Sequence, residues 1–177
     1  DVIGQDSLAS ARQIHNPVTS NDDILGVFDG ITYQKGAAVI GMFERWLGPD
    51  EFRAGVRAYL AQFSRGNATS ADFLAAIGTA TGVDVATPFS TFLDQVGAPA
   101  ITVATRCEAG AAPTFSLSQQ RFLPPGSMAN AAQTWQVPVC LRWGLGKRVH
   151  TQCTLLTTAH LELPIDGAPR CPDWVFG

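Results

Sequence analysis

The chain has 177 residues, of which 46% are hydrophobic and 15% charged, so it can bury a core in one or two domains. Its formal net charge is −3 and no basic cluster exceeds the pair Lys147-Arg148, so the charge pattern of a nucleic-acid-binding protein is missing. No apolar run approaches the roughly 20 residues of a membrane span, so we expect no membrane span in this segment.

The first thirty residues carry no strong periodicity. We expect a short helix over 7–12, and extended chain at Asn16-Pro17 because the residue before a proline avoids the helical region. His15 is a candidate zinc ligand or base, but no second metal-type ligand lies at helical spacing from it. We therefore interpret His15 as a surface or capping residue. The start at Asp1, without an initiator methionine or a signal peptide, and the apolar end at 174–177 are typical of a piece of a longer protein.

The longest amphipathic run begins near Phe28 and ends at Gly48-Pro49, because glycine suits the residue after a helix and proline cannot continue one. Its apolar residues recur at helical spacing: Val39, Met42, Phe43, Trp46 and Leu47. Tyr33 and Lys35 are therefore expected in the first turn of a buried helix. Thr32 is the candidate N-cap of that helix.

Tyr33 has two interpretations. It is either a half-buried aromatic residue whose hydroxyl bonds a backbone group, or a phenol that donates a hydrogen bond into a cleft and stabilises an oxyanion. Position alone favours packing, since most aromatic residues at such places are packing residues. Asp29 is interpreted as capping the helix start, with lining of the cleft as the alternative. Lys35 is given a structural role, pairing with a carboxylate such as Asp29.

Three more helices follow, over 49–63, 69–82 and 87–97. The first opens with Pro49 and acidic residues in its first turn. The second opens with Thr69-Ser70-Ala71-Asp72, which resembles a capping box. The third opens at Thr87-Pro88, and Gly97 is expected to close it.

The periodicity changes to two-residue alternation after Pro99. Strands are expected around 101–103, 115–117, 136–143, 149–155 and 161–163. Gly144-Leu145-Gly146-Lys147 predicts a hairpin turn, and Pro138 places its strand at a sheet edge or a bulge because it lacks an amide hydrogen. The sequence thus predicts an α+β chain: an N-terminal helical subdomain over 1–98, then a small antiparallel β-sandwich over 99–177.

Four cysteines lie in the last 71 residues: Cys107, Cys140, Cys153 and Cys171. No C-x-x-C pair occurs, which argues against a zinc knuckle, and the even, clustered count favours two disulfides. Disulfides would imply an exported protein, whether periplasmic, secreted or at the cell surface. Free buried thiols are the alternative, and the three pairings of four cysteines stay open. His150 and His160 have no partner at ligand spacing, so we interpret both as ordinary surface or hydrogen-bonded residues.

Three motifs in the helical half agree in spacing and residue type with one family. They are Phe28-Asp29-x-Ile31-x-Tyr33-x-Lys35-Gly36-Ala37, then Leu47-Gly48-x-Asp50-x-Phe52-Arg53-x-Gly55, and Gln95-x-Gly97-x-Pro99. Together they resemble the zinc aminopeptidases of the aminopeptidase N type, the gluzincin family. The family's usual tryptophan before the last motif is replaced by Phe92. The resemblance is strong over 20–103, modest over 1–19, and architectural over 104–177.

The resemblance implies a metallopeptidase, a hydrolase that removes N-terminal residues from peptide substrates with zinc as its cofactor. Tyr33 would be the tyrosine that stands opposite the metal and stabilises the tetrahedral intermediate. Residues 1–98 would be the C-terminal helical part of the catalytic domain, and residues 99–177 the β domain that follows it in many members.

The metal half of such a site is not in this sequence. A zinc peptidase of this class needs H-E-x-x-H on a helix, because two histidines four residues apart face one metal and the glutamate activates water. No His-Glu dipeptide occurs in the chain. The resemblance places the whole zinc site before Asp1, so we expect no metal ligand or cofactor here, Tyr33 as the only catalytic residue, and no activity from the fragment alone.

Two other functions remain open. The chain could be a non-catalytic module on the same fold that lost the metal and docks peptides or proteins. A weaker alternative is a secreted adhesion domain built on the sandwich, which explains the cysteines but not the Tyr-x-Lys-Gly motif. An H-E-x-x-H motif in the roughly hundred preceding residues of the parent sequence would favour the peptidase over both.

Overall fold

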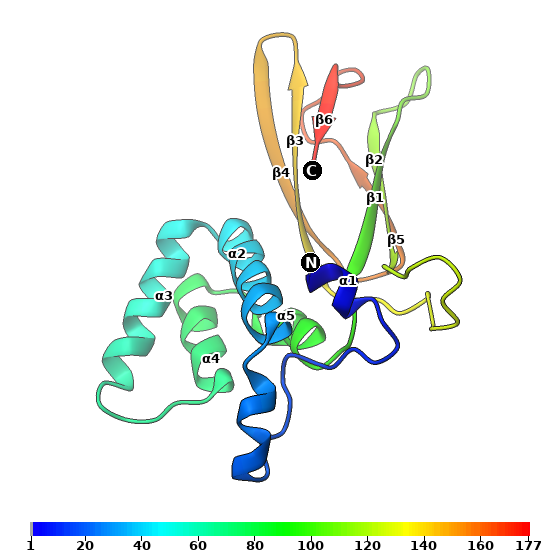
Figure 1. Cartoon of the computed structure of the whole chain (residues 1–177). Helices are drawn as coiled ribbons and strands as arrows, with labels where there is room; N and C mark the ends of the chain where they lie inside the picture. The colour runs from blue at the N-terminus through cyan, green and yellow to red at the C-terminus, as the bar shows by residue number, and fades with distance from the viewer. Residues whose placement is uncertain (1) are drawn as a thin grey trace. The chain divides into compact units, whose positions relative to one another are not determined.

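Figure 1 shows the computed structural model of the chain, which describes residues 2–177. The chain divides into two compact units. The first contains the residues up to Asp6 together with Ala11–Val96, and the second contains Ser7–Ser10 and Gly97–Gly177. The first unit is helical and the second holds the strands. The predicted α+β class, with helices first and antiparallel sheets after them, is confirmed.

Among its described residues the helical unit contains five α-helices, one π-helical turn, and two short 3-10 helices, Asn21–Asp23 and Leu25–Val27. The α-helices and the π-helical turn are α1 (Val2–Asp6), the π-helical turn Ile31–Lys35, α2 (Gly36–Leu47), α3 (Pro49–Gln62), α4 (Ser70–Thr81) and α5 (Ala86–Leu93). The helix expected over 7–12 is wrong, because the helical residues there are Val2–Asp6. Gly97 does not close α5 either; the helix ends at Leu93, with Asp94 as its C-cap.

Aromatic residues fill the core of the helical unit. Phe43 of α2 is fully buried, and its ring centre lies 4.7 Å from that of Phe89 and 6.2 Å from that of Phe92. Both partners belong to α5, and the Phe92 ring meets Phe43 edge-on. The helical spacing of the apolar residues in α2 thus corresponds to one face packed on α5.

The predicted capping box of α4 is confirmed. The Thr69 hydroxyl accepts a hydrogen bond from the Asp72 amide at 3.2 Å, and the Asp72 carboxylate accepts one from the Thr69 amide at 2.8 Å. At the other end, Gly82 caps the helix in the left-handed conformation, with φ of 69°. Two local sequence signals therefore determine both ends of this helix.

Helices α3 and α4 approach each other at Gly55. A Cβ atom on Gly55 would lie 2.8 Å from Ile77 Cδ1 and 2.9 Å from Ile77 Cα. We expect Gly55→Ala to lower the free energy of unfolding by about 1–3 kcal/mol, because a clash with a backbone atom cannot be relieved by a rotamer change. Urea unfolding followed by circular dichroism measures this.

Gly41→Ala in α2 is the matched control, because nothing lies within 4 Å of the added Cβ. That substitution should raise stability by about 0.5–1 kcal/mol, since alanine is the better helix former. An equal rise for both substitutions would contradict close packing at Gly55.

The second unit contains two three-stranded antiparallel sheets, ordered β1-β2-β5 and β4-β3-β6. The strands are β1 (Pro99–Arg106), β2 (Thr114–Arg121), β3 (Val137–Leu145), β4 (Arg148–Leu156), β5 (His160–Pro164) and β6 (Trp174–Phe176). Strand β6 was not expected from the sequence, because three residues are too few to show an alternating pattern.

The β3 pattern predicted the buried face of its sheet. Val137, Val139, Leu141 and Trp143 are all buried. Gln119 of β2 joins the two sheets: its side-chain nitrogen donates to the Leu156 carbonyl at the end of β4, at 3.4 Å. It also donates to the carbonyls of Trp135, before β3, and Thr158, after β4, both at 2.9 Å. A buried amide with all these bonds satisfied fixes how the sheets pack.

Pro138 lies in the central strand of its sheet, yet the expectation of an edge holds locally. Strand β6 pairs only with Arg142–Gly144, so Pro138 has a strand neighbour on the β4 side alone. The β3–β4 ladder continues past Pro138 in unbroken register, so there is no bulge. The hairpin turn is shorter than predicted, because Leu145 and Arg148 already pair.

The structure selects one of the three cysteine pairings. Cys107 bonds Cys171, and Cys140 bonds Cys153. The first bond joins the chain after β1 to the segment before β6, and the second links directly opposed residues of β3 and β4. The prediction of two disulfides is confirmed.

Candidate functional site

Tyr33 lies on a wide turn and not in the first turn of α2. Residues Ile31–Lys35, which we call the Tyr33 turn, are π-helical, and the Gly36 amide donates to the Ile31 carbonyl five residues back. Ile31 and Lys35 are only 4% and 7% exposed, whereas Tyr33 is 59% exposed. The expectation of a buried helix is therefore wrong for Tyr33, because the turn buries its two ends and presents the phenol outward.

Asp29 and Arg12 hold the start of the Tyr33 turn. Asp29 Oδ1 accepts a hydrogen bond from the Thr32 amide at 3.0 Å, as predicted for a capping residue. The prediction that Thr32 is the N-cap is wrong. Arg12 donates two hydrogen bonds to the same carboxylate, at 2.6 and 3.1 Å, and a third to the Thr32 hydroxyl at 2.6 Å. The Thr32 hydroxyl therefore accepts a hydrogen bond from Arg12 and does not cap a helix amide.

These contacts determine the charge state of Asp29. Partial burial acts to raise the pKa of Asp29, but bonds from the Thr32 amide and the Arg12 guanidinium together hold it below the ordinary value of 3.8. A depressed carboxyl pKa stabilises the fold above the ordinary value, and that stability is lost as the pH falls through the lowered value. Asp29 thus stays ionised and paired with Arg12 at neutral pH.

Lys35 and Asp6 hold the end of the Tyr33 turn. Lys35 Nζ lies 3.0 Å from Asp6 Oδ2 and 3.2 Å from Asp6 Oδ1, and donates to the Gln95 carbonyl at 3.4 Å. The side chains of Lys35 and Asp6 are 7% and 3% exposed. The expectation that Lys35 pairs with Asp29 is wrong, because Asp29 forms its ion pair with Arg12.

An apolar hollow of about 330 Å³ lies beside Tyr33. It is lined by Ile14, Thr32, Tyr33, Gly36, Ala37, Val39, Ile40, Phe89 and Leu93. The hydroxyls of Thr32 and Tyr33 are its only side-chain polar groups, and Thr32 already bonds Arg12. The chemistry that this hollow offers a ligand is therefore one phenol beside an apolar wall.

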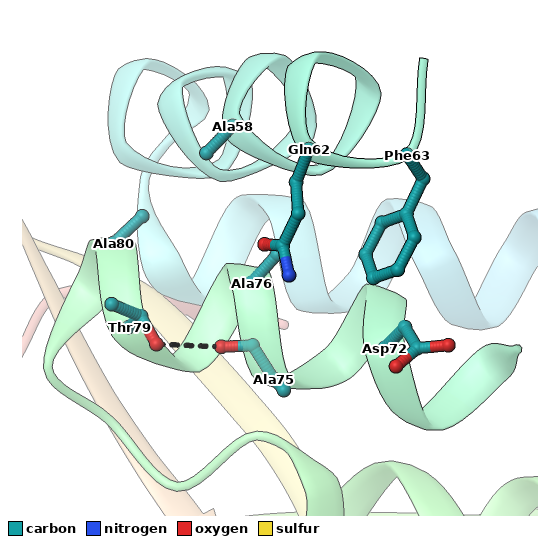
Figure 2. A pocket seen from close by; sticks show the side chains of 8 residues that line it. All are labelled: Ala58, Gln62, Phe63, Asp72, Ala75, Ala76, Thr79 and Ala80. Atoms are coloured by element: carbon teal, nitrogen blue, oxygen red, sulfur yellow. Dashed lines mark hydrogen bonds between the residues drawn. The ribbon is translucent and has the colours of Figure 1, made fainter. Parts of the chain in front are cut away.

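A second hollow lies between α3 and α4, and Figure 2 shows its lining. Four of the eight lining residues are alanines, and the Thr79 hydroxyl donates to the Ala75 carbonyl at 2.9 Å. Gln62, the last residue of α3, and Phe63, the C-cap of that helix, extend toward α4 across this hollow. It brings together no pair of groups suited to acid–base, nucleophilic or metal chemistry, so we do not assign it a catalytic role.

The three histidines have separate surroundings, and each can be described by its own contacts. His15 is exposed, with Nδ1 3.1 Å from Asp94, and His150 stacks on Trp143 with ring centres 4.1 Å apart. His160 begins β5 and is exposed. Within residues 2–177, no three histidine, cysteine, aspartate or glutamate side chains cluster so as to hold a metal ion. The described residues therefore do not fit a zinc site.

Sequence reasoning did not identify Arg12 and Asp6 as parts of this site. Their partners lie 17 and 29 residues away along the chain, and no local periodicity marks such contacts. The only available signal was compositional: a lysine inside an apolar helical pattern needs a buried anion.

Over residues 2–177, no helix is both long and apolar enough to cross a membrane.

Comparison with known proteins identifies the family. The model described as "Peptidase family M1 domain" matches residues 1–92. Aminopeptidase A of Gloydius brevicauda is 35% identical over 151 residues, covering 82% of this chain and 15% of its own length. Alanine/arginine aminopeptidase of Saccharomyces cerevisiae is 34% identical (78% of this chain, 16% of its own), and glutamyl aminopeptidase of Homo sapiens is 34% identical (76% and 14%).

The chain thus spans about 15% of the length of the relatives it matches. A match to 82% of the chain cannot fit within the helical unit, so the similarity extends into the sheets as well. The resemblance read from the three motifs is confirmed: the chain belongs to peptidase family M1.

Proposed function

We propose that the chain is part of a zinc metallo-aminopeptidase that removes N-terminal residues from peptides. Membership of family M1, which is zinc-dependent, and relatives named as aminopeptidases support this proposal. Residues 1–98 supply the C-terminal helical part of the catalytic domain, and residues 99–177 form the β domain that follows. The zinc ligands belong to the part of the full-length protein outside this chain.

Tyr33 is the catalytic residue in this proposal, and its exposure on an anchored turn carries the argument. The phenol is 59% exposed while both ends of its turn are buried. A phenol donates one hydrogen bond, and a bond to a charged oxygen is roughly twice as strong as one to a neutral oxygen. Tyr33 therefore stabilises the oxyanion of the tetrahedral intermediate more than the substrate carbonyl, and that difference accelerates the reaction.

The test is Tyr33→Phe in the full-length protein. We expect kcat to fall about 10²–10³-fold, the usual loss when one oxyanion donor is removed. KM and the melting temperature should change little, because an exposed hydroxyl contributes little to stability. Cleavage of a peptide carrying an N-terminal reporter residue measures kcat and KM.

Tyr59→Phe is the matched control, because Tyr33 and Tyr59 are the two tyrosines of the chain. Tyr59 packs on Phe63 and Phe73, with ring centres 5.5 and 5.3 Å away. The kcat of the Tyr59→Phe variant should equal that of the unmodified protein. Equal kcat for both variants would remove Tyr33 from the mechanism.

The chain by itself should cleave no peptide, with or without added zinc, because residues 2–177 provide no ligand cluster. Turnover above background in the same assay would contradict this expectation. A full-length sequence without H-E-x-x-H ahead of residue 1 would instead favour the non-catalytic binding module.

We also propose that the protein is exported. Its two disulfides support this location, because disulfides persist in oxidising compartments and are rare where glutathione keeps thiols reduced.

A further inference from the structure

Burying the Asp6–Lys35 ion pair costs more desolvation free energy than a purely structural link would need to cost. Both charges are removed from water, with side chains 3% and 7% exposed. Replacing such a pair by apolar residues of similar volume often leaves stability unchanged or improves it. Stability alone therefore does not account for an ion pair at this position, and its geometry is the property to consider.

The geometry ties three segments to one ammonium group. Lys35 is the last residue of the Tyr33 turn, Asp6 ends α1, and Gln95 follows α5. Lys35 Nζ reaches the Asp6 carboxylate at 3.0 and 3.2 Å and the Gln95 carbonyl at 3.4 Å. The backbone two residues after Tyr33 is thereby fixed to parts of the chain 29 and 60 residues away.

The other end of the Tyr33 turn is fixed as well, through Asp29 and Arg12. The Asp29–Arg12 pair is more exposed than the Asp6–Lys35 pair, with the Asp29 side chain 43% exposed. Water screens an exposed pair and leaves it adjustable, whereas a buried pair is held in one arrangement. Of the two anchors, the Asp6–Lys35 pair is the rigid one.

We propose that Asp6 and Lys35 are positioning residues that hold the Tyr33 turn so that the phenol meets the oxyanion. This inference rests on the proposed function of Tyr33. The pair touches no substrate; it sets the direction of the Tyr33 side chain through the backbone of the π-helical turn. A misplacement of about 1 Å at a catalytic group can cost 10²-fold in rate, so a rigid anchor close to Tyr33 has a large effect.

The test uses the full-length protein and the double variant Asp6→Leu/Lys35→Met, alone and together with Tyr33→Phe. The double variant removes both charges and leaves neither one unpaired, so its melting temperature should stay near that of the unmodified protein. Its kcat should fall about 10–100-fold, with KM nearly unchanged. In the Tyr33→Phe background the same double change should lower kcat no more than about 3-fold, because the donor it positions is already gone.

The matched control is Asp50→Leu/Arg53→Met, which makes the same replacements in the exposed ion pair of α3. It should keep full kcat. Should Asp6→Leu/Lys35→Met fail to fold, Asp6→Asn keeps the volume and an accepting oxygen. That single variant should lower kcat about 3–10-fold in the unmodified background and leave it unchanged with Tyr33→Phe.

The failures can be told apart. Unchanged kcat in Asp6→Leu/Lys35→Met, beside a large loss in Tyr33→Phe, overturns the positioning role and leaves the proposed function standing. An equal loss from the double change in both backgrounds also overturns it, because a general structural role would not depend on the Tyr33 hydroxyl. Unchanged kcat in Tyr33→Phe overturns the proposed function, and the inference with it.

Discussion

Lys35→Met alone should lower the free energy of unfolding of the chain by about 3–5 kcal/mol, the usual cost of removing one partner of a buried ion pair. The Asp6 carboxylate would keep its burial, with a side chain 3% exposed, and lose the cation 3.0 Å away. Methionine fills nearly the same volume, so the loss reports on charge and not on a cavity. Urea unfolding followed by the helical circular dichroism signal measures it.

Arg53→Met is the comparison for Lys35→Met, since Arg53 pairs with Asp50 at 2.9 Å on the exposed side of α3. An exposed pair of this kind contributes about 0–1 kcal/mol. Equal, small effects of the two substitutions would mean that Asp6 is stabilised without the Lys35 charge. Adding Asp6→Leu to Lys35→Met should recover most of the lost stability.

Replacing both Cys107 and Cys171 by alanine should lower stability by about 4 kcal/mol, because their disulfide closes the longer loop. The two residues are 64 apart in sequence. Loop closure removes entropy from the unfolded chain in proportion to the logarithm of the loop length. The effect is large for a unit whose last strand, β6, pairs with only three residues of β3.

The same change at Cys140 and Cys153, which are 13 residues apart, should cost about 3 kcal/mol. Unfolding of both variants, followed by tryptophan fluorescence, gives the order of the two effects. A larger loss at Cys140 and Cys153 would contradict the entropic account. Hydrogen exchange should also show β6 amides opening first when the Cys107–Cys171 bond is missing.

Local signals predicted much of the fold. Helix α4 was bounded by the Thr69–Asp72 capping box and Gly82, and both ends agree with the structure. The alternation of β3 gave its buried face, because successive side chains of a strand point to opposite sides. Family membership was also accessible, since the Tyr-x-Lys-Gly motif and its neighbours keep a fixed spacing.

The remaining errors concern contacts between residues distant in sequence. Lys35 was assigned to the nearby Asp29, but Asp6, 29 residues earlier, is its partner. The cysteine pairing could not be chosen, because four cysteines allow three connectivities and the sequence alone does not distinguish them. The Tyr33 turn was expected to be α-helical, since a π-helical turn keeps an apolar pattern that differs by a single residue.

That single residue has a consequence for how the protein tolerates insertions and deletions. Each residue of an α-helix turns the chain by about 100°. Deleting one codon within Ile31–Lys35 would let the segment close as an ordinary helix, and the apolar stripe of α2 would be untouched. The phenol, however, would swing roughly a quarter of the way around the helix axis. Under the proposed mechanism, a family member shortened by one residue here would keep α2 and turn a different side chain toward the substrate.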